Sequence, residues 1–253
     1  MSANPLRISF CTTCMGRLEH LKETLPQNLA NTVDYPNAEF VILAYGDRKV
    51  FNWVKANFPE EIKQERIKLA YTKQEYFRMS HAKNMAHRLG DGDVLVNLDA
   101  DNVLEKGFAQ WLDSEFKEGS HKLVRVSSRD AFVERRIHGK EVQGIGGRLA
   151  IHKHSYEKLH GYDEKINAWG GDDIQLEARA TSIGMKKVAI PTDLYGRVIK
   201  HTNVERYENM SHSDQEKSIK SLGSDSQKNV FLRRLNTAAI LAGLKKSSYA
   251  TNL

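Results

Sequence analysis

The chain has 253 residues and a formal net charge of +6, from 38 lysines and arginines against 32 aspartates and glutamates. Apolar residues make up 40% of it and charged residues 28%, which excludes a disordered chain, a fibrous protein and a disulfide-rich mini-protein. No run approaches the roughly 18 to 20 apolar residues of a membrane helix, and the start, MSANPLRISF, lacks the apolar stretch of a signal peptide. We therefore expect a cytoplasmic protein without a transmembrane segment.

The first half of the chain alternates short apolar runs with helical patterns. The runs predict strands over 6–11, 39–45, 67–71 and 93–98, and helices follow near Leu18, near Val50 and over 80–89. This order predicts a mostly parallel central sheet with helices on both faces, an α/β fold. Ligands bind such sheets beyond the carboxyl ends of the strands. Three polar groups fall there: a predicted turn over 12–16, Asp47, and the pair at 99 and 101.

The second half is less regular. Strands are predicted over 122–127, 149–152 and around 198–199, with helices over 155–159 and 172–183. The polar stretch 203–226 predicts a mobile loop, and an amphipathic helix over about 227–244 is expected to pack back on the domain. The chain therefore predicts a single domain with a C-terminal helical appendage.

Two acidic motifs suggest chemistry. Asp99-Ala100-Asp101 directly follows an apolar strand, and two carboxylates on such a turn suit Mg²⁺ or Mn²⁺; the alternative is a solvated turn. In the segment WGGDD at 169–173, two glycines permit close ligand approach before two acids open a helix. A carboxylate there can act as a general base. The alternative is helix capping by Asp172 with Trp169 in the core, which is compatible with catalysis.

The two cysteines, Cys11 and Cys14, form a CxxC motif after a predicted strand. Reduced thiols are the default, because two cysteines cannot build a disulfide framework. A thioredoxin-like redox element, in which a helix N-terminus lowers the pKa of a thiol, is the alternative. That alternative leaves both acidic motifs unexplained.

The order of motifs over about 6–205 resembles nucleotide-sugar glycosyltransferases of the GT-A fold, especially the inverting branch related to β-1,4-galactosyltransferases and the bacterial family 2 enzymes. The segment FCTTCMGR at 10–17 resembles the family's opening strand and loop, LAYGD at 43–47 its second strand, HAKN at 81–84 its ARN segment near the diphosphate, and NLDADN at 97–102 its DxD motif. The resemblance implies that the nucleotide-sugar is bound by Thr12, Thr13, Arg17, Asp47, Lys83 and Asp99. Lys83 and Arg17 could equally be ordinary surface charges.

The later motifs narrow the branch. GGRLAI at 146–151 is similar to the acceptor-side segment of galactosyltransferases, AWGGDD at 168–173 to their WGGED motif, and RVIKH at 197–201 to their RMIRH segment. The resemblance implies Asp173 as catalytic base and a metal held by Asp101, His201 and Asp99, and it places the acceptor against Asp172, Trp169, Gly170, Gly171 and Gly147. Val198 replaces a methionine ligand of some members, and Asp172 replaces the usual glutamate.

These implications describe an Mn²⁺- or Mg²⁺-dependent inverting enzyme that moves a hexose or N-acetylhexosamine from a UDP-sugar to a saccharide or glycolipid acceptor, as in capsule or lipopolysaccharide synthesis. Residues 1–205 would be the glycosyltransferase domain, with a nucleotide-binding half (1–105) and an acceptor-binding half (106–205), and 206–253 a lid loop and a packed helix. The basic pairs at 233–234 and 245–246 would also suit a phage-type enzyme acting on modified bases of DNA. A non-catalytic nucleotide-sugar or nucleic-acid binding module is a further alternative.

Overall fold

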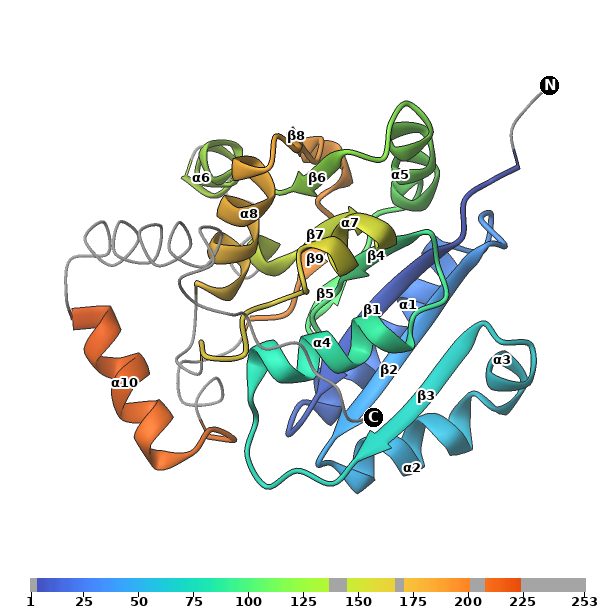
Figure 1. Cartoon of the computed structure of the whole chain (residues 1–253). Helices are drawn as coiled ribbons and strands as arrows, with labels where there is room; N and C mark the ends of the chain where they lie inside the picture. The colour runs from blue at the N-terminus through green and yellow to red at the C-terminus, as the bar shows by residue number, and fades with distance from the viewer. Residues whose placement is uncertain (1–3, 137–144, 167–170, 201–207, 224–253) are drawn as a thin grey trace.

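The computed structural model describes residues 4–136, 145–166, 171–200 and 208–223. Its centre is a seven-stranded sheet in the order β3-β2-β1-β4-β7-β6-β8 (Figure 1). Only β7 runs antiparallel to its neighbours, β4 and β6, so the predicted, mostly parallel sheet is confirmed. The strands are β1 (Ile8–Cys14), β2 (Ala38–Tyr45), β3 (Ile67–Thr72), β4 (Val94–Asn97), β6 (Lys122–Arg125), β7 (Leu149–His152) and β8 (Lys186–Ala189); β5 (Asn102–Val103) and β9 (Arg197–Val198) pair separately.

Helices cover both faces of the sheet, as predicted. The helix α4 lies in front of the sheet in Figure 1, with α7 and α8 on the same face, and α1 lies behind it with α2 and α5. The helices of these two layers are α1 (Leu18–Asn31), α2 (Arg48–Asn57), α4 (Met79–Leu89), α5 (Phe108–Lys117), α7 (Lys153–Lys158) and α8 (Asp172–Ser182). Shorter or peripheral helices are α3 (Pro59–Lys63), η1 (Ile145–Gly147), η2 (Thr192–Leu194), α6 (Ser128–Arg136) and α10 (His212–Gly223).

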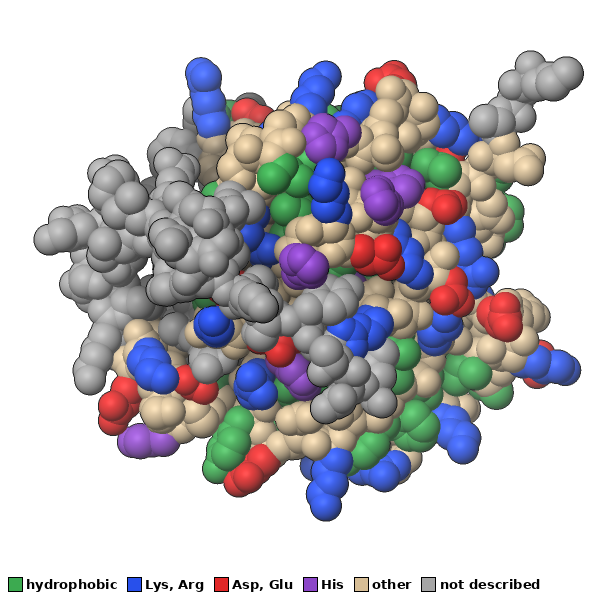
Figure 2. Space-filling view, viewed as in Figure 1, with side chains coloured by type: hydrophobic (Ala, Val, Ile, Leu, Met, Phe, Trp, Pro, Cys, Tyr) green, Lys and Arg blue, Asp and Glu red, His purple; other side chains and the backbone are tan. Residues whose placement is uncertain are grey.

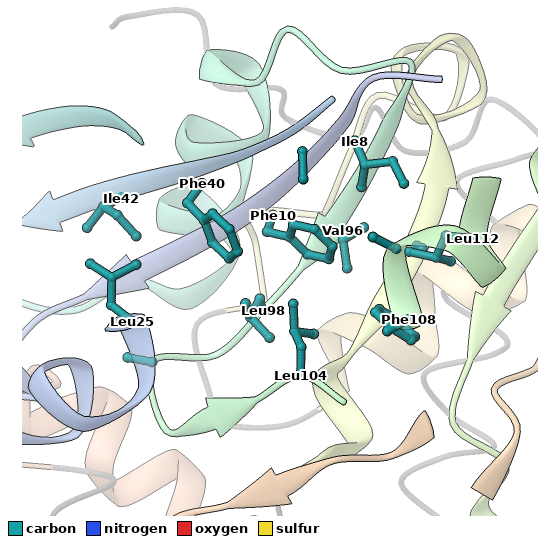
Figure 3. Close-up of a cluster of buried hydrophobic side chains, with 14 of the residues drawn as sticks. Ile8, Phe10, Leu25, Phe40, Ile42, Val96, Leu98, Leu104, Phe108 and Leu112 are labelled. Atoms are coloured by element: carbon teal, nitrogen blue, oxygen red, sulfur yellow. The ribbon is translucent and has the colours of Figure 1, made fainter. Parts of the chain in front are cut away.

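The alternation of side chains along the strands divides the core into two layers. In β1, Ile8, Phe10 and Cys14 face the layer of α1, whereas Cys11 faces the layer of α4. Phe10 stacks on Phe40 with ring centroids 5.2 Å apart (Figure 3). Because both sides of β2 and β4 are buried, most of their residues are apolar, and their apolar runs predicted these strands.

The CxxC motif lies inside a strand, not at the start of a helix. The predicted turn over 12–16 is wrong in its first part, because β1 continues to Cys14. Both thiols are free and buried, on opposite faces of the sheet. Burial raises the pKa of both, that of Cys14 to about 12, whereas a redox cysteine needs a lowered pKa. The redox alternative is therefore contradicted.

The C-terminal part differs from the expectation where it is described. Residues 212–223 form α10, so a loop throughout 203–226 is wrong for that segment. The predicted helix over 227–244 and the basic pairs at 233–234 and 245–246 lie outside the described residues. In the described parts of the chain, no helix has the length and apolar character needed to cross a membrane. Figure 2 shows acidic and basic side chains interspersed over one face of the molecule.

Candidate active site

The loops after β1 and β2 are tied together at the carboxyl edge of the sheet. Asp47 ends the turn after β2, and its Oδ1 accepts hydrogen bonds from the amides of Lys49 and Val50 at the start of α2. Its Oδ2 accepts from the amide of Gly16, 2.9 Å away in the loop after β1. Asp47 thus joins two of the predicted nucleotide-binding loops.

The other residues predicted to bind the nucleotide in and after β1 differ in exposure. Thr12 and Thr13 both lie within β1, where Thr12 is buried and Thr13 half-buried, and Arg17 is half-buried beyond the strand. Asn209, far along the chain, packs on the loop after β1. Its side-chain amide donates to the carbonyl of Met15 at 3.4 Å, and its backbone carbonyl accepts from the amide of Phe77 at 2.6 Å. A segment far along the chain therefore lies over this edge of the sheet, and closure over a donor stays a prediction.

Each carboxylate of the DxD turn accepts a hydrogen bond from an asparagine side chain. Asn97 donates to Asp99 Oδ1 at 3.1 Å, and Asn102 donates to Asp101 Oδ1 at 2.7 Å. Burial raises the pKa of Asp99; Lys83 opposes this effect, and the charge of Asp101 adds to it. The two amide donors orient these carboxylates. Metal binding by Asp99 and Asp101 stays a prediction.

A buried arginine connects this turn to β9. Arg148 is 1% exposed, donates to Asn102 Oδ1 at 3.0 Å and also donates to the carbonyl of Tyr195. Burial lowers its pKa to about 10, against the opposing effect of Asp99 and Asp101. The amide of Ile199 donates to the carbonyl of Asp101 at 2.9 Å, so the chain that leads toward residue 201 runs beside the DxD turn. His201 itself lies outside the described residues.

The second acidic pair opens α8. Gly171 precedes it with φ of 100°, a left-handed conformation that favours glycine. Lys83 of α4 places its Nζ 2.6 Å from Asp172 Oδ2 and 2.9 Å from Asp173 Oδ1. Burial, followed by the charge of Asp172, raises the pKa of Asp173 to about 7, although Lys83 opposes the shift. Burial alone would lower the pKa of Lys83, but Asp172, Asp173 and Asp99 outweigh it and raise that pKa.

One carboxylate from each acidic pair lies close to Gly147. A β carbon at Gly147 would lie 2.7 Å from Asp99 Oδ2 and 3.5 Å from Asp173 Oδ2, so both carboxylates approach the same glycine. The carbonyl of Gly147 also accepts from Asn97 at 2.9 Å. The structure therefore assembles residues 83, 99, 147, 172 and 173 from separate elements. Trp169 and Gly170 lie outside the described residues.

The residues of the turn suit a hard divalent cation, because Asp99 and Asp101 offer carboxylate oxygens, the ligands that Mg²⁺ and Mn²⁺ prefer. Within the described ranges no group of three or more histidine, cysteine, aspartate or glutamate side chains is arranged to hold a metal ion. That His201 supplies a further ligand stays a prediction.

The sequence did not single out Asn97, Asn102 or Arg148 as functional. Both asparagines flank the DxD motif, and an amide beside each carboxylate is a signal that could have found them. Nothing near Arg148 in the sequence indicates its partners. They lie about fifty residues away on either side, at Asn102 and Tyr195.

Parts of the chain are similar in sequence to known proteins. Residues 127–214 match a family model described as the N-terminal domain of galactosyltransferase, a segment that includes Gly147 and the acidic pair of α8. The chain is 23% identical over 208 residues to polypeptide N-acetylgalactosaminyltransferase 8 of Drosophila melanogaster. That match covers 68% of this chain and 34% of the relative, so the chain spans about a third of the relative's length.

Solved structures share the fold. The mannosyltransferase PcManGT from Pyrobaculum calidifontis, in complex with GDP-Man and Mn²⁺, is similar with a TM-score of 0.63 and 17% identity, over 94% of this chain and 70% of that one. GalNAc-T7 with UDP, GalNAc and Mn²⁺ is similar with a TM-score of 0.59 and 15% identity, over 75% of this chain and 43% of that one. S. aureus TarS 1-349 in complex with UDP has a TM-score of 0.59 and 12% identity, over 89% of this chain and 74% of that one. The chain therefore has the GT-A fold of nucleotide-sugar glycosyltransferases, as its motifs predicted.

Proposed function

We propose that the protein is a metal-dependent inverting glycosyltransferase that moves a hexose or N-acetylhexosamine from a UDP-sugar to an acceptor hydroxyl. The observation that carries this proposal is the approach of Asp99 and Asp173 to Gly147. One carboxylate belongs to a turn suited to a cation, and the other has a pKa raised to about 7. A donor site and a proton acceptor are thus adjacent.

In this mechanism Asp173 accepts the proton of the acceptor hydroxyl. The acceptor oxygen forms a bond to the anomeric carbon while the bond from that carbon to the diphosphate oxygen breaks, and the nucleoside diphosphate leaves. Attack from the face opposite the leaving group inverts the configuration. Burial raises the pKa of Asp173 toward neutral pH, which strengthens this carboxylate as a proton acceptor.

Asp99 and Asp101, with His201, would hold Mn²⁺ or Mg²⁺. The bound ion supplies positive charge that stabilises the departing diphosphate. Asn97 and Asn102 orient the two carboxylates, and Asp47 holds the loop after β1 against α2 for the nucleotide. Two solved structures of the same fold contain Mn²⁺ with a nucleotide or nucleotide-sugar, which supports a role for a metal ion here.

The test is a screen of UDP-glucose, UDP-galactose, their N-acetyl forms and GDP-mannose with Mn²⁺, with and without a panel of acceptors. We expect one UDP-sugar to be turned over, EDTA to abolish turnover, and added Mn²⁺ to restore it. NMR of the product should show the anomeric configuration inverted. A product that retains the donor configuration would refute the single displacement, and full turnover in EDTA would refute the role of the metal.

A further inference from the structure

The ammonium group of Lys83 is enclosed by carboxylates. Its side chain is 4% exposed, and its two closest partners are the oxygens of Asp172 and Asp173, at 2.6 and 2.9 Å. The ring of Tyr162 covers it further, with the centroid 5.0 Å from Nζ. A lysine that binds a phosphate presents its protons to the ligand, whereas Lys83 directs two of its three into the protein.

The backbone that carries Lys83 is held firmly. The next residue, Asn84, accepts hydrogen bonds from the hydroxyl of Tyr156 at 2.6 Å and from the amide of Tyr162 at 2.8 Å. It also donates to the carbonyl of Tyr162 at 2.9 Å. His87, one turn later, stacks on Tyr156 with ring centroids 4.9 Å apart. The position of Lys83 Nζ is therefore set by packing between α4 and the segment that leads to α8.

The two carboxylates that Lys83 contacts are not equivalent. The side chain of Asp172 is 1% exposed, whereas that of Asp173 is 14% exposed. Lys83 contacts Oδ1 of Asp173, and Oδ2 lies on the side of Gly147 and Asp99. One oxygen of Asp173 is thus fixed by the lysine while the other faces the position proposed for the reaction.

From this geometry we infer that Lys83 is a positioning residue for Asp172 and Asp173, and not a ligand of the donor diphosphate. Asp172 anchors the lysine, the lysine fixes Oδ1 of Asp173, and Oδ2 is thereby directed at the acceptor hydroxyl. This inference rests on the proposed function and assigns a different role to a residue that the sequence placed at the phosphates. It also explains how two adjacent carboxylates stay together inside the protein, since Lys83 offsets one of their charges.

The test compares Lys83→Met and Lys83→Arg with the wild-type protein and with Lys122→Met as matched control. Lys122 is also largely buried and contacts two carboxylates, Glu115 at 3.1 Å and Glu118 at 3.2 Å, outside the site. Thermal unfolding first confirms that each variant is folded. Calorimetry with UDP and Mn²⁺ then gives the UDP affinity, and kinetics with the turned-over UDP-sugar give kcat and the donor KM.

We expect Lys83→Met to lower kcat at least about 100-fold while the UDP affinity and donor KM change less than about threefold. Lys83→Arg should recover part of kcat, and Lys122→Met should leave all three values unchanged. If Lys83→Met does not fold, Lys83→Met with Asp172→Asn removes one charge of each sign and is measured in its place. A tenfold loss of UDP affinity in any folded Lys83 variant, or an unchanged kcat in a variant without the lysine, would overturn the inference.

The controls separate this outcome from failure of the proposed function. A wild-type protein that neither binds UDP nor transfers sugar overturns the proposed function and the inference with it. A wild-type protein that binds UDP without transfer overturns only the function as an enzyme, and the UDP affinity of the variants then decides the role of Lys83. Unchanged affinity supports a role away from the phosphates, and a tenfold loss contradicts it.

Discussion

The two acidic pairs of the site differ in the contacts that the structure shows for them. Asp99 and Asp101 accept hydrogen bonds from the side-chain amides of Asn97 and Asn102. Asp172 and Asp173 share the ammonium of Lys83, which offsets one charge of the pair. Under the proposed function, the first pair would hold the cation and Asp173 of the second pair would accept a proton. Within one site, the partner of each carboxylate determines what it can do.

The sharpest way to break this comparison is to neutralise one carboxylate of each pair. Asp101→Asn should abolish Mn²⁺-dependent binding of UDP and turnover together, because the cation loses a ligand. Asp173→Asn should lower kcat by about 10³-fold or more while UDP affinity with Mn²⁺ is retained, because only the base is lost. Calorimetry and steady-state kinetics measure both. Equal effects of the two variants on UDP affinity would contradict the division of roles.

A second test compares two buried arginines, one that contacts the DxD turn and one that contacts the loop beside α8. Arg148→Met removes hydrogen bonds to Asn102 and to the carbonyl of Tyr195, and we expect the free energy of unfolding to fall by roughly 2 to 4 kcal/mol. The concentration of Mn²⁺ needed for half-maximal UDP binding should also rise, because Asn102 orients Asp101.

Arg179→Met is the matched control for Arg148. Arg179 is equally buried and donates to the carbonyls of Leu159 and Gly161, beside α8. Its loss should destabilise the protein by a similar amount, as urea unfolding would measure, without changing the Mn²⁺ dependence. If both variants changed the Mn²⁺ dependence alike, the effect of Arg148 would be one of general stability.

A third test concerns the packing that holds α4 and its lysine. His87 is buried, its Nδ1 donates to the carbonyl of Lys83 at 2.7 Å, and burial lowers its pKa from 6.5 to about 4. The folded state therefore binds fewer protons than the unfolded state between these values, so the free energy of unfolding decreases as the pH falls through 6.5 toward 4. The full loss amounts to roughly 3 kcal/mol.

Urea unfolding at pH 7 and pH 5 measures this contribution. His87→Phe retains an aromatic ring against Tyr156 and Tyr162 but cannot titrate, so its stability should change less between the two pH values than that of the wild-type protein. The exposed His154 serves as control, and His154→Gln should behave as the wild type. An equal pH dependence in His87→Phe would show that other groups cause the acid sensitivity.

Local patterns predicted the scaffold well where both faces of a strand are buried. The expected strand over 39–45 is β2, and the strand over 149–152 coincides with β7. The edge strand β8 was missed, because Lys186–Ala189 is largely exposed and has no apolar run. β1 was predicted too short, because its polar threonines lie within the strand.

The site was predictable only in part, for a related reason. The acids at 99, 101, 172 and 173 were found because they stand next to one another in motifs. The contact between Lys83 and Asp172 joins two elements far apart in the chain, and no local pattern specifies it. The roles given to Trp169, Gly170 and His201 stay predictions.

The smallest expected effect, and the finest test of the comparison, lies where the two pairs meet. In Gly147→Ala the added methyl group would lie 2.7 Å from Asp99 Oδ2, so that carboxylate must move by some tenths of an ångström, whereas Asp173 Oδ2 at 3.5 Å need not. Gly146→Ala, next to it, meets nothing within 4 Å.

We expect Gly147→Ala to weaken Mn²⁺-dependent UDP binding about tenfold, roughly 1.4 kcal/mol, and Gly146→Ala to leave it unchanged. Calorimetry with UDP at several Mn²⁺ concentrations measures both. Because only the carboxylate of Asp99 is displaced, the kcat of Gly147→Ala at saturating UDP-sugar and Mn²⁺ should equal that of the wild-type protein. A lower kcat would mean that the substitution also disturbs Asp173.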